Sequence, residues 1–420
     1  MKKFLLISLV SINAFSQSSN IFEPIDVFDL EYVSNTQISS YGDKVLYQRN
    51  FNDIMTDESF SNIWLIDYDG TNNRPITTGN FKDNSPKWSN KGDKFIFKSN
   101  REGKSQIFLF DLNNNSIQKL TNFQYSIEST QWSPDDNYIL FSSFIDSERD
   151  TLIEMPDKPK GAKWNDPPVE ISDLNYRYDS SGFRKPGEVQ FFTIPINGGT
   201  PRQISNLKPE KRAGQGVWLG NDKIIFSANL NEDSDYNTNN SEIYVLDLDS
   251  GEHKALTSRN GPDYSPKVSH DDSMIAYLGY DDEYLGYQQN SIYIMNSDGS
   301  DKYKIQLDID RNISNIYWSG DNRKIFFQFD DKGITKIAST TLDGKLKTEV
   351  DEVGGLSFSR PYSGGFFSLS KNNRYSFTYG TAYNPADLAV GFRGSKKRLT
   401  NLNKDLFDYK KLGNVEEIWY

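Results

Sequence analysis

Residues 132–141 read WSPDDNYILF, a polar turn between a tryptophan and a short apolar run. Close copies read WSNKGDKFIF at 88–97 and ISSYGDKVLY at 38–47. Shorter variants of the turn are WLGND at 218–222, VSHDD at 268–272, WSGDN at 318–322 and LSKNN at 369–373. The segment therefore occurs seven times, which indicates a repeat architecture.

The second residue of each copy measures the period of the repeat. From Ser39 to Ser370, successive copies lie 50, 44, 86, 50, 50 and 51 residues apart. The spacing of 86 is one period plus about forty residues. The sequence therefore predicts an insertion in the third repeat, at about residues 146–187.

Each repeat also carries an alternating strand that ends in an acidic residue or asparagine. Examples are IWLID at 63–67, IFLFD at 107–111, IYVLD at 243–247 and IYIMN at 292–296. Four short strands every fifty or so residues cannot bury their faces alone, whereas radial packing covers them. We expect an all-β, seven-bladed propeller at residues 33–400, with four antiparallel strands per blade. Because the strand order is the same from Ser39 to Thr400, we expect no strand-swap closure.

The N-terminus has the features of a secretory signal peptide at residues 1–16. Lys2 and Lys3 precede an apolar run at 4–10, and Ala-Phe-Ser at 14–16 forms a cleavage site. We therefore expect a periplasmic or secreted protein, with a lead-in segment at 17–32. The apolar run is shorter than the roughly 20 residues that cross a bilayer, so we expect no membrane span.

Composition excludes several classes of function. The chain has 47 basic and 58 acidic residues, a net charge of -11, which disfavours binding to nucleic acid. It has no cysteine, which rules out disulfides, thiolate metal sites and a cysteine nucleophile. No phosphate-binding loop is present, and we expect no cofactor.

The repeated turn and strand resemble the propeller repeat of the translocation protein TolB and of prolyl oligopeptidase-family serine peptidases. Three stretches favour the acylaminoacyl peptidase and dipeptidyl peptidase-like branch of the peptidases. They are FEPIDVFDLEYVS at 22–34, the blade-three segments at 164–183 and 196–204, and KRLTNLN at 397–403 with VEEIWY at 415–420. In that family, an α/β-hydrolase domain with the catalytic serine, aspartate and histidine follows the propeller.

The resemblance implies a propeller that gates peptide substrates for an exported serine peptidase. Residues 401–420 would be the exit segment toward a hydrolase domain that this chain lacks, so we expect the chain alone to be inactive. We also expect an apolar strand at 406–420 without a partner. One alternative is a free-standing, TolB-like periplasmic propeller that binds protein partners. A weaker alternative is sugar binding or glycoside chemistry, which no carboxylate constellation supports.

Motifs for catalysis and metal binding fail on inspection. A nucleophile elbow needs Gly-x-Ser-x-Gly, and the nearest match, GLSFS at 355–359, lacks the second glycine. We interpret it as part of a strand. His253 and His270 are the only histidines, and we expect both in exposed turns. Residues 233–237 (DSDYN) resemble the start of a calcium loop, but Thr238 replaces its glycine.

The remaining candidate site is Arg177, Tyr178 and Asp179 in the predicted insertion. Long polar insertions lie at the rim of a propeller, where they can face a substrate or a partner domain. The alternative is structural: Arg177 and Asp179 would pair locally while the neighbouring aromatics pack the insertion onto its blade.

Overall fold

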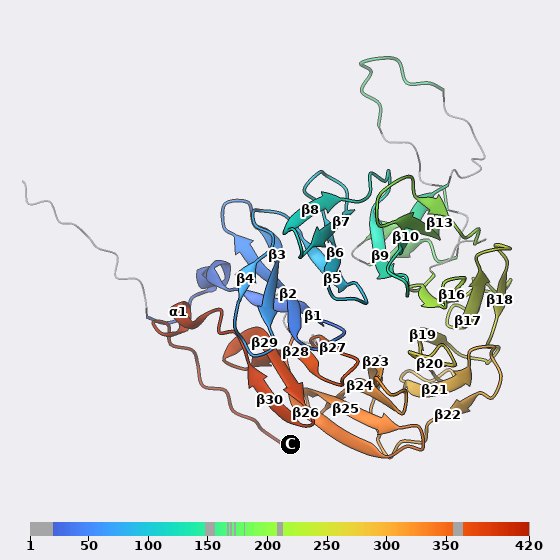
Figure 1. Ribbon diagram of the computed structural model, residues 1–420. Helices are drawn as coiled ribbons and strands as arrows, with labels where there is room; N and C mark the ends of the chain where they lie inside the picture. The colour runs from blue at the N-terminus through green and yellow to red at the C-terminus, as the bar shows by residue number, and fades with distance from the viewer. Residues whose placement is uncertain are drawn as a thin grey trace, which may run out of the picture.

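The computed structural model describes residues 20–147, 156–165, 168, 170–171, 174–179, 181–207, 213–355 and 364–419. Seven four-stranded antiparallel sheets surround a central axis (Figure 1). Their successive strands occupy successive places from the axis outward, so each blade is built from one continuous stretch of chain. The predicted seven-bladed propeller, with four strands per blade, is confirmed.

The strands of blades one to three are as follows. Blade one contains β1 (Tyr32–Ile38), β2 (Lys44–Asp53), β3 (Glu58–Asp67) and β4 (Arg74–Pro75). Blade two contains β5 (Asn84–Trp88), β6 (Lys94–Ser99), β7 (Gln106–Asp111) and β8 (Ser116–Lys119). Blade three contains β9 (Ile127–Trp132), β10 (Tyr138–Asp146), β13 (Gly187–Pro195) and β14 (Arg202–Gln203), with the hairpin β11 (Arg177–Tyr178) and β12 (Gly182–Phe183) between β10 and β13.

The strands of the other four blades, and the two short helices, complete the molecule. Blade four contains β15 (Val217–Leu219), β16 (Lys223–Ala228), β17 (Glu242–Asp247) and β18 (His253–Ala255). Blade five contains β19 (Asp263–Val268), β20 (Met274–Gly279), β21 (Ser291–Asn296) and β22 (Tyr303–Lys304). Blade six contains β23 (Ile313–Trp318), β24 (Lys324–Asp331), β25 (Ile334–Thr341) and β26 (Leu346–Val353). Blade seven contains β27 (Phe367–Leu369), β28 (Tyr375–Thr381), β29 (Asn384–Phe392) and β30 (Ser395–Arg398). The 3-10 helix η1 (Pro24–Asp29) precedes β1, and the one-turn helix α1 (Lys404–Phe407) follows β30.

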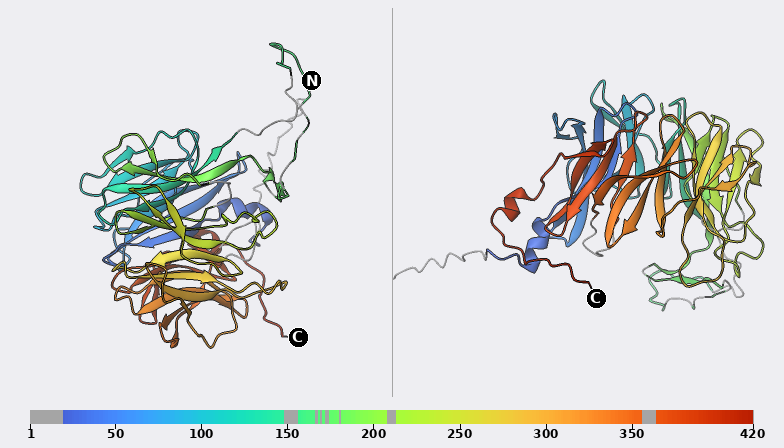
Figure 2. Two further views of the ribbon diagram at one scale, coloured as in Figure 1. Left: turned by 90° about the vertical axis from the view of Figure 1, so that its right-hand side faces the viewer. Right: turned by 90° about the horizontal axis from the view of Figure 1, so that it is seen from below.

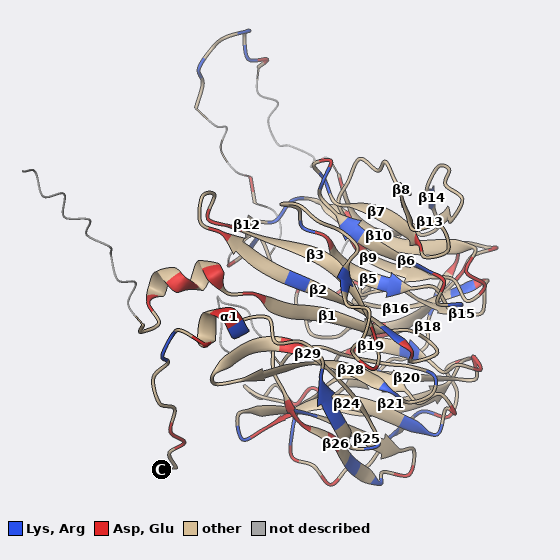
Figure 3. Ribbon diagram, turned by 60° about the vertical axis from the view of Figure 1, so that its left-hand side comes forward, with Lys and Arg blue, Asp and Glu red and all other residues tan. Residues whose placement is uncertain are grey.

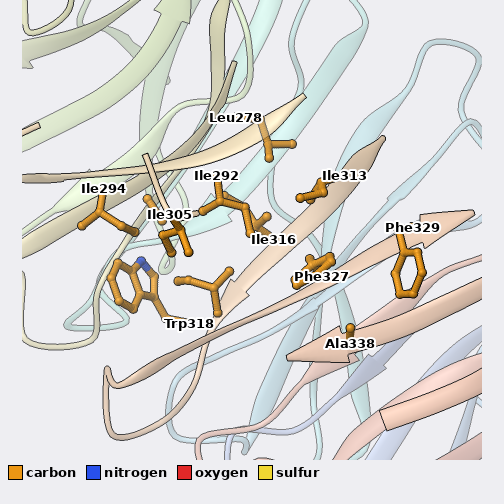
Figure 4. Packing of buried hydrophobic residues seen from close by; sticks show 12 residues of the cluster. Leu278, Ile292, Ile294, Ile305, Ile313, Ile316, Trp318, Phe327, Phe329 and Ala338 are labelled. Carbon is orange, nitrogen blue, oxygen red and sulfur yellow. The ribbon is translucent and has the colours of Figure 1, made fainter. Parts of the chain in front are cut away.

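The apolar core lies between neighbouring blades. Figure 4 shows the layer between blades five and six, where Leu278 and Ile294 face Trp318 and Phe327. All four side chains are buried. Each layer needs two sheets, which is why no blade can stand alone.

The serine of the repeated turn closes the hairpin between the first two strands of a blade. The hydroxyl of Ser133 accepts a hydrogen bond from the amide of Tyr138 at 2.9 Å. The same bond recurs at Ser39, Ser89, Ser269, Ser319 and Ser370. Blade four has Leu219 at this position, so its turn lacks the hydroxyl.

Residues with positive φ in these turns link one blade to the next. Asp136 has φ 60°, and its carboxylate accepts the amides of Asn90 at 2.7 Å and Lys91 at 3.0 Å. Asn322 and Asn373 accept amides of the preceding blade in the same way. The serine turns lie on one face of the disc, which we call the turn face, and in these blades they are hydrogen-bonded to one another.

The opposite face carries the insertion and both ends of the described chain. Because the strands alternate in direction, connections between second and third strands emerge opposite the serine turns. The segment between β10 and β13 is such a connection. Figure 2 shows η1, the C-terminal segment and the insertion on one side of the disc. We call this side the insertion face.

Two expectations about the C-terminal part and the membrane can be compared with the structure. The strand expected at residues 406–420 is wrong: α1 occupies the start of this stretch, and residues 412–419 belong to no sheet. In this stretch Phe407 and Lys410 contact Phe22 and Asp26 of the lead-in, and do not extend a blade. Within the described residues, no helix is both long and apolar enough to cross a membrane.

In three blades, the tryptophan of the repeat ties the innermost strand to that of the preceding blade. The indole Nε1 of Trp132 donates to the carbonyl of Lys87 at 2.9 Å, and Trp88 and Trp318 make the equivalent bond. Trp218 is equally buried, with 5% exposure like Trp132. Its Nε1 has no partner among the described residues.

We predict that Trp132→Phe lowers the free energy of unfolding by about 1 kcal/mol more than Trp218→Phe does. Both changes remove a similar apolar area, but only the first also removes a hydrogen bond. Urea unfolding followed by circular dichroism measures the difference. Equal losses for the two variants would show that the indole bond contributes nothing.

A hydroxyl at the end of the fourth strand caps the third strand in five blades. The Oγ1 of Thr257 accepts the amide of Ile243 at 2.9 Å, and Thr77, Thr121, Ser205 and Thr400 make the same contact. Thr257 then donates to the carboxylate of Glu242 at 2.6 Å. Blades two and three have Gln106 and Gln190 in place of this acid.

Burial raises the pKa of Glu242 from its ordinary 4.5 to about 7, although Thr257 and Arg259 oppose the shift and Asp263 adds to it. The folded state therefore binds more protons than the unfolded state between these values. Stability falls as the pH rises through that window and stays reduced above it.

We predict that Glu242→Gln raises the free energy of unfolding by about 1–2 kcal/mol at pH 8 and leaves it unchanged at pH 4. The exposed Glu252, changed to Gln, serves as the control and should have no effect at either pH. Thermal unfolding at several pH values measures both. A gain at pH 4 as large as at pH 8 would contradict the assigned cause.

Candidate functional site

The insertion forms one wall of a pocket on the insertion face. The pocket has a volume of about 580 Å³, and its lining includes Tyr178, Phe183 and Arg184 from the insertion. Phe144 at the end of β10 and Ala213 before β15 line the opposite wall. The pocket therefore lies between the insertion and the ends of blades three and four.

Local geometry explains how the hairpin is held over the pocket. Arg184 donates to the carbonyl of Asn175 at 2.9 Å, and its guanidinium lies 5.6 Å from the centre of the Tyr178 ring. Tyr176 stacks on Phe183 with 6.3 Å between ring centres. At the return to β13, Gly187 has φ 144°, and a side chain there would clash with the carbonyl of Ile145.

The three residues predicted from the insertion are placed differently. Tyr178 lines the pocket, whereas Arg177 and Asp179 are exposed. No ion pair joins Arg177 to Asp179, so the local pairing considered for them is absent from the described structure. A role of these residues in substrate or domain contact stays a prediction.

A second, smaller pocket lies on the inner wall of the ring. It measures about 160 Å³ and is lined by the innermost strands of blades one to three and by Gln215 before β15. Its lining includes Gln37, Lys87, Lys98 and Glu128. Glu128 also lines the insertion pocket, so the two pockets adjoin. We call the space enclosed by the innermost strands the central channel.

The channel wall is basic, in contrast to the chain as a whole. Lys87 of β5 and Lys98 of β6 are half-buried in blade two, and Lys267 of β19 is half-buried in blade five. Burial and the nearby charges of Lys267 and Lys98 lower the pKa of Lys87 to about 8. Burial also lowers the pKa of Lys267 and of Lys98.

Sequence reasoning missed these lysines. Lys87 and Lys267 both stand two residues before the serine of the repeated turn, a position held by Gln37, Gln131 and Tyr317 in other blades. That shared position was the available signal. It could not be used because the repeat alone does not show which strand residues face the axis.

The lead-in and the exit segment, which we call the two arms (residues 20–31 and 401–411), run side by side on the insertion face. Asp26 and Lys410 form an ion pair at 2.9 Å, with both side chains mostly buried. Asn403 exchanges two hydrogen bonds of 2.8 Å with the backbone of Glu31. Figure 3 shows the acidic η1 close to α1.

No catalytic arrangement is found among the described residues. His270 is exposed in a turn, as expected. His253 is exposed in β18, not in a turn, and packs against the ring of Tyr244. Residues 356–359 of the GLSFS stretch lie outside the described residues. In the described ranges, no three His, Cys, Asp or Glu residues gather as metal ligands, residues 233–237 included.

Comparison with known proteins identifies what the fold is similar to. Residues 32–158 match the TolB beta propeller domain. The chain is 25% identical over 226 residues to the "Uncharacterized peptidase YuxL" of Bacillus subtilis, covering 53% of this chain and 33% of that protein. It is 23% identical over 340 residues to "Dipeptidyl-peptidase 5" of Porphyromonas gingivalis, covering 76% and 48%.

A solved structure shows the same fold over nearly the whole chain. The acylaminoacyl peptidase of Pyrococcus horikoshii superposes with a TM-score of 0.69 at 19% identity, covering 91% of this chain and 54% of that chain. The predicted resemblance to a TolB-like repeat and to peptidase propellers is therefore confirmed. The chain spans a third to about a half of the length of these relatives.

We predict that Asp26→Asn exposes the exit arm to trypsin. Removing the charge breaks the ion pair that holds Lys410, so cleavage after Lys410 and Lys411 should be several-fold faster. Asp29→Asn, which alters an exposed acid of the same helix, is the matched control. Mass spectrometry of timed digests locates the cuts, and equal rates for the two variants would contradict this role.

Proposed function

We propose that this chain is the propeller that admits peptides to the catalytic domain of an exported serine peptidase. One observation carries the proposal: both arms, the insertion and the pocket beside the channel lie on the same face of the ring. A domain attached through the exit arm would then cover that face. The peptidase names of the curated relatives support the same assignment.

In this proposal the serine, aspartate and histidine belong to sequence outside this chain. The propeller would restrict access through its width and through the side chains that line the passage. Short peptides could pass between the insertion and the channel, whereas a folded protein could not. Such sieving protects folded neighbours from the peptidase without any change in its chemistry.

Export is part of the proposal and rests on residues 1–16, which lie outside the described residues. A basic start, an apolar run and a small-residue cleavage site are the features of a secretory signal. The absence of cysteine is compatible with an oxidising compartment because no thiol is present to be oxidised.

A TolB-like scaffold that binds protein partners is the second candidate. The match of residues 32–158 to the TolB beta propeller domain favours it. A scaffold would use the same insertion face, but for a protein surface and not for a passing peptide. The two candidates differ in whether a reactive serine accompanies the propeller.

We predict that a fluorophosphonate probe, which labels activated serines, leaves this chain unlabelled and labels the longest product of its natural reading frame. That product should cleave short peptidyl p-nitroanilides and spare a folded protein such as native ribonuclease. Labelling of this chain alone would contradict the division of labour. A reading frame that continues into no Gly-x-Ser-x-Gly segment would overturn the proposal in favour of the scaffold.

A further inference from the structure

We propose that the central channel contains a carboxylate-binding site formed by Lys87 and Lys98, to which Lys267 of blade five adds positive charge. The site goes beyond gating by width, because it would select peptides by charge. The inference of an anion site depends only on the residues of the channel. The identification of the ligand as a peptide rests on the proposed function.

The same backbone irregularity precedes two of these lysines. In β5 the register against β6 shifts between Asn84 and Lys87, and in β19 it shifts against β20 between Tyr264 and Lys267. Within these shifts Ser85 has φ 54° and Ser265 has φ 53°. A bulge of this kind turns the next side chain out of the regular alternation.

The two bulged strands belong to blades two and five, and both are the innermost strands of their blades. The charge of Lys267 is among the causes that lower the pKa of Lys87. Lys98 reaches the same region from β6, and its Nζ donates to the carbonyl of Glu128 at 2.6 Å. Lys87 and Lys98 therefore line one pocket, while Lys267 lies on the innermost strand of blade five.

These cations are not neutralised by the protein. Within the described residues, none of the three lysines forms an ion pair. Lys267 lies 5.7 Å from the ring centre of Tyr317, which offers a weak attraction only. Glu128 acts on Lys98 at longer range, and its carboxylate is the one acid lining the pocket.

Such an arrangement costs stability in the free protein. Half-buried like charges repel and lose hydration, so a chain selected for stability alone would replace them. In a protein with eleven more acids than bases, acidic partners are abundant elsewhere. An anion that enters the channel would remove this cost, which is why the cluster indicates a binding site.

Size and charge point to a single carboxylate as the ligand group. The pocket of about 160 Å³ has room for an acidic side chain or a chain terminus, not for a nucleic acid strand. The net charge of -11 repels polyanions at long range. Asn35, Gln37 and Gln215 add neutral side-chain amides beside the lysines.

The test is calorimetric titration of this chain with three blocked peptides. Acetyl-trialanine carries a terminal carboxylate, its amide carries none, and acetyl-Ala-Glu-Ala-amide carries a side-chain carboxylate only. We expect the amide of trialanine not to bind and at least one acid peptide to bind. Which acid binds distinguishes a chain terminus from an acidic side chain.

Lys87→Met and Lys267→Met should each weaken that binding at least tenfold, whereas Lys254→Met, at an exposed lysine of β18, should not. Circular dichroism checks the fold, and Lys98→Met replaces either variant if it does not fold. Binding should also weaken as the pH rises from 7 to 9, because Lys87 then loses its proton; Lys98, Lys267, Glu128 and Tyr317 are the other titratable groups that face it.

Three results would overturn the site: equal binding of acid and amide peptides, unchanged affinity in the lysine variants, or equal competition by chloride, which indicates an adventitious ion only. No peptidase activity is used in the measurement. If this chain binds the carboxylate but the longest product of the reading frame is not labelled by the fluorophosphonate, only the peptidase assignment is overturned. Labelling without carboxylate binding would overturn only this site.

Discussion

Blade seven meets blade one through side chains and turns, because no strand is shared between them. The hydroxyl of Thr36 donates to Ser376 at 2.5 Å, and the amide of Ile38 donates to Ser368 at 2.7 Å. Every apolar layer of the molecule stays buried only while this seam is closed. The paired arms, which join the entry to blade one with the exit from blade seven, hold the two sides of the seam together. The paired arms therefore help to close the ring between blades seven and one.

The charge distribution divides the molecule into an acidic exterior and a basic interior wall. Many acidic residues lie in turns and in η1, and some of them accept backbone amides, as Asp136 does. The half-buried lysines of the channel form no ion pair within the described residues. In a partly dehydrated channel their attraction for an anion is stronger than that of a surface lysine. A ligand that enters the channel would meet this positive charge.

The sequence was sufficient for the fold, because the repeated turn has a local chemical cause. Serine, a positive-φ residue and an alternating run specify the same hairpin in blade after blade, and the long interval located the insertion in blade three. The lysine site depends on which residues face the axis across the ring, which a single repeat does not contain. Residues 406–420 were mistaken for a strand because their apolar residues were assigned to a sheet edge. In the structure Phe407 instead stacks near Phe22 of the lead-in, 6.2 Å between ring centres.

The pairing of the arms has a consequence for how such a ring can be joined to another protein. The backbone of Lys411 bonds to Asn20 at 2.6 Å, so the whole ring departs from and returns to one spot. A unit with adjoining ends can be spliced into a surface loop of an unrelated host without stretching the host backbone. The ring therefore has ends placed as insertion into a host loop requires.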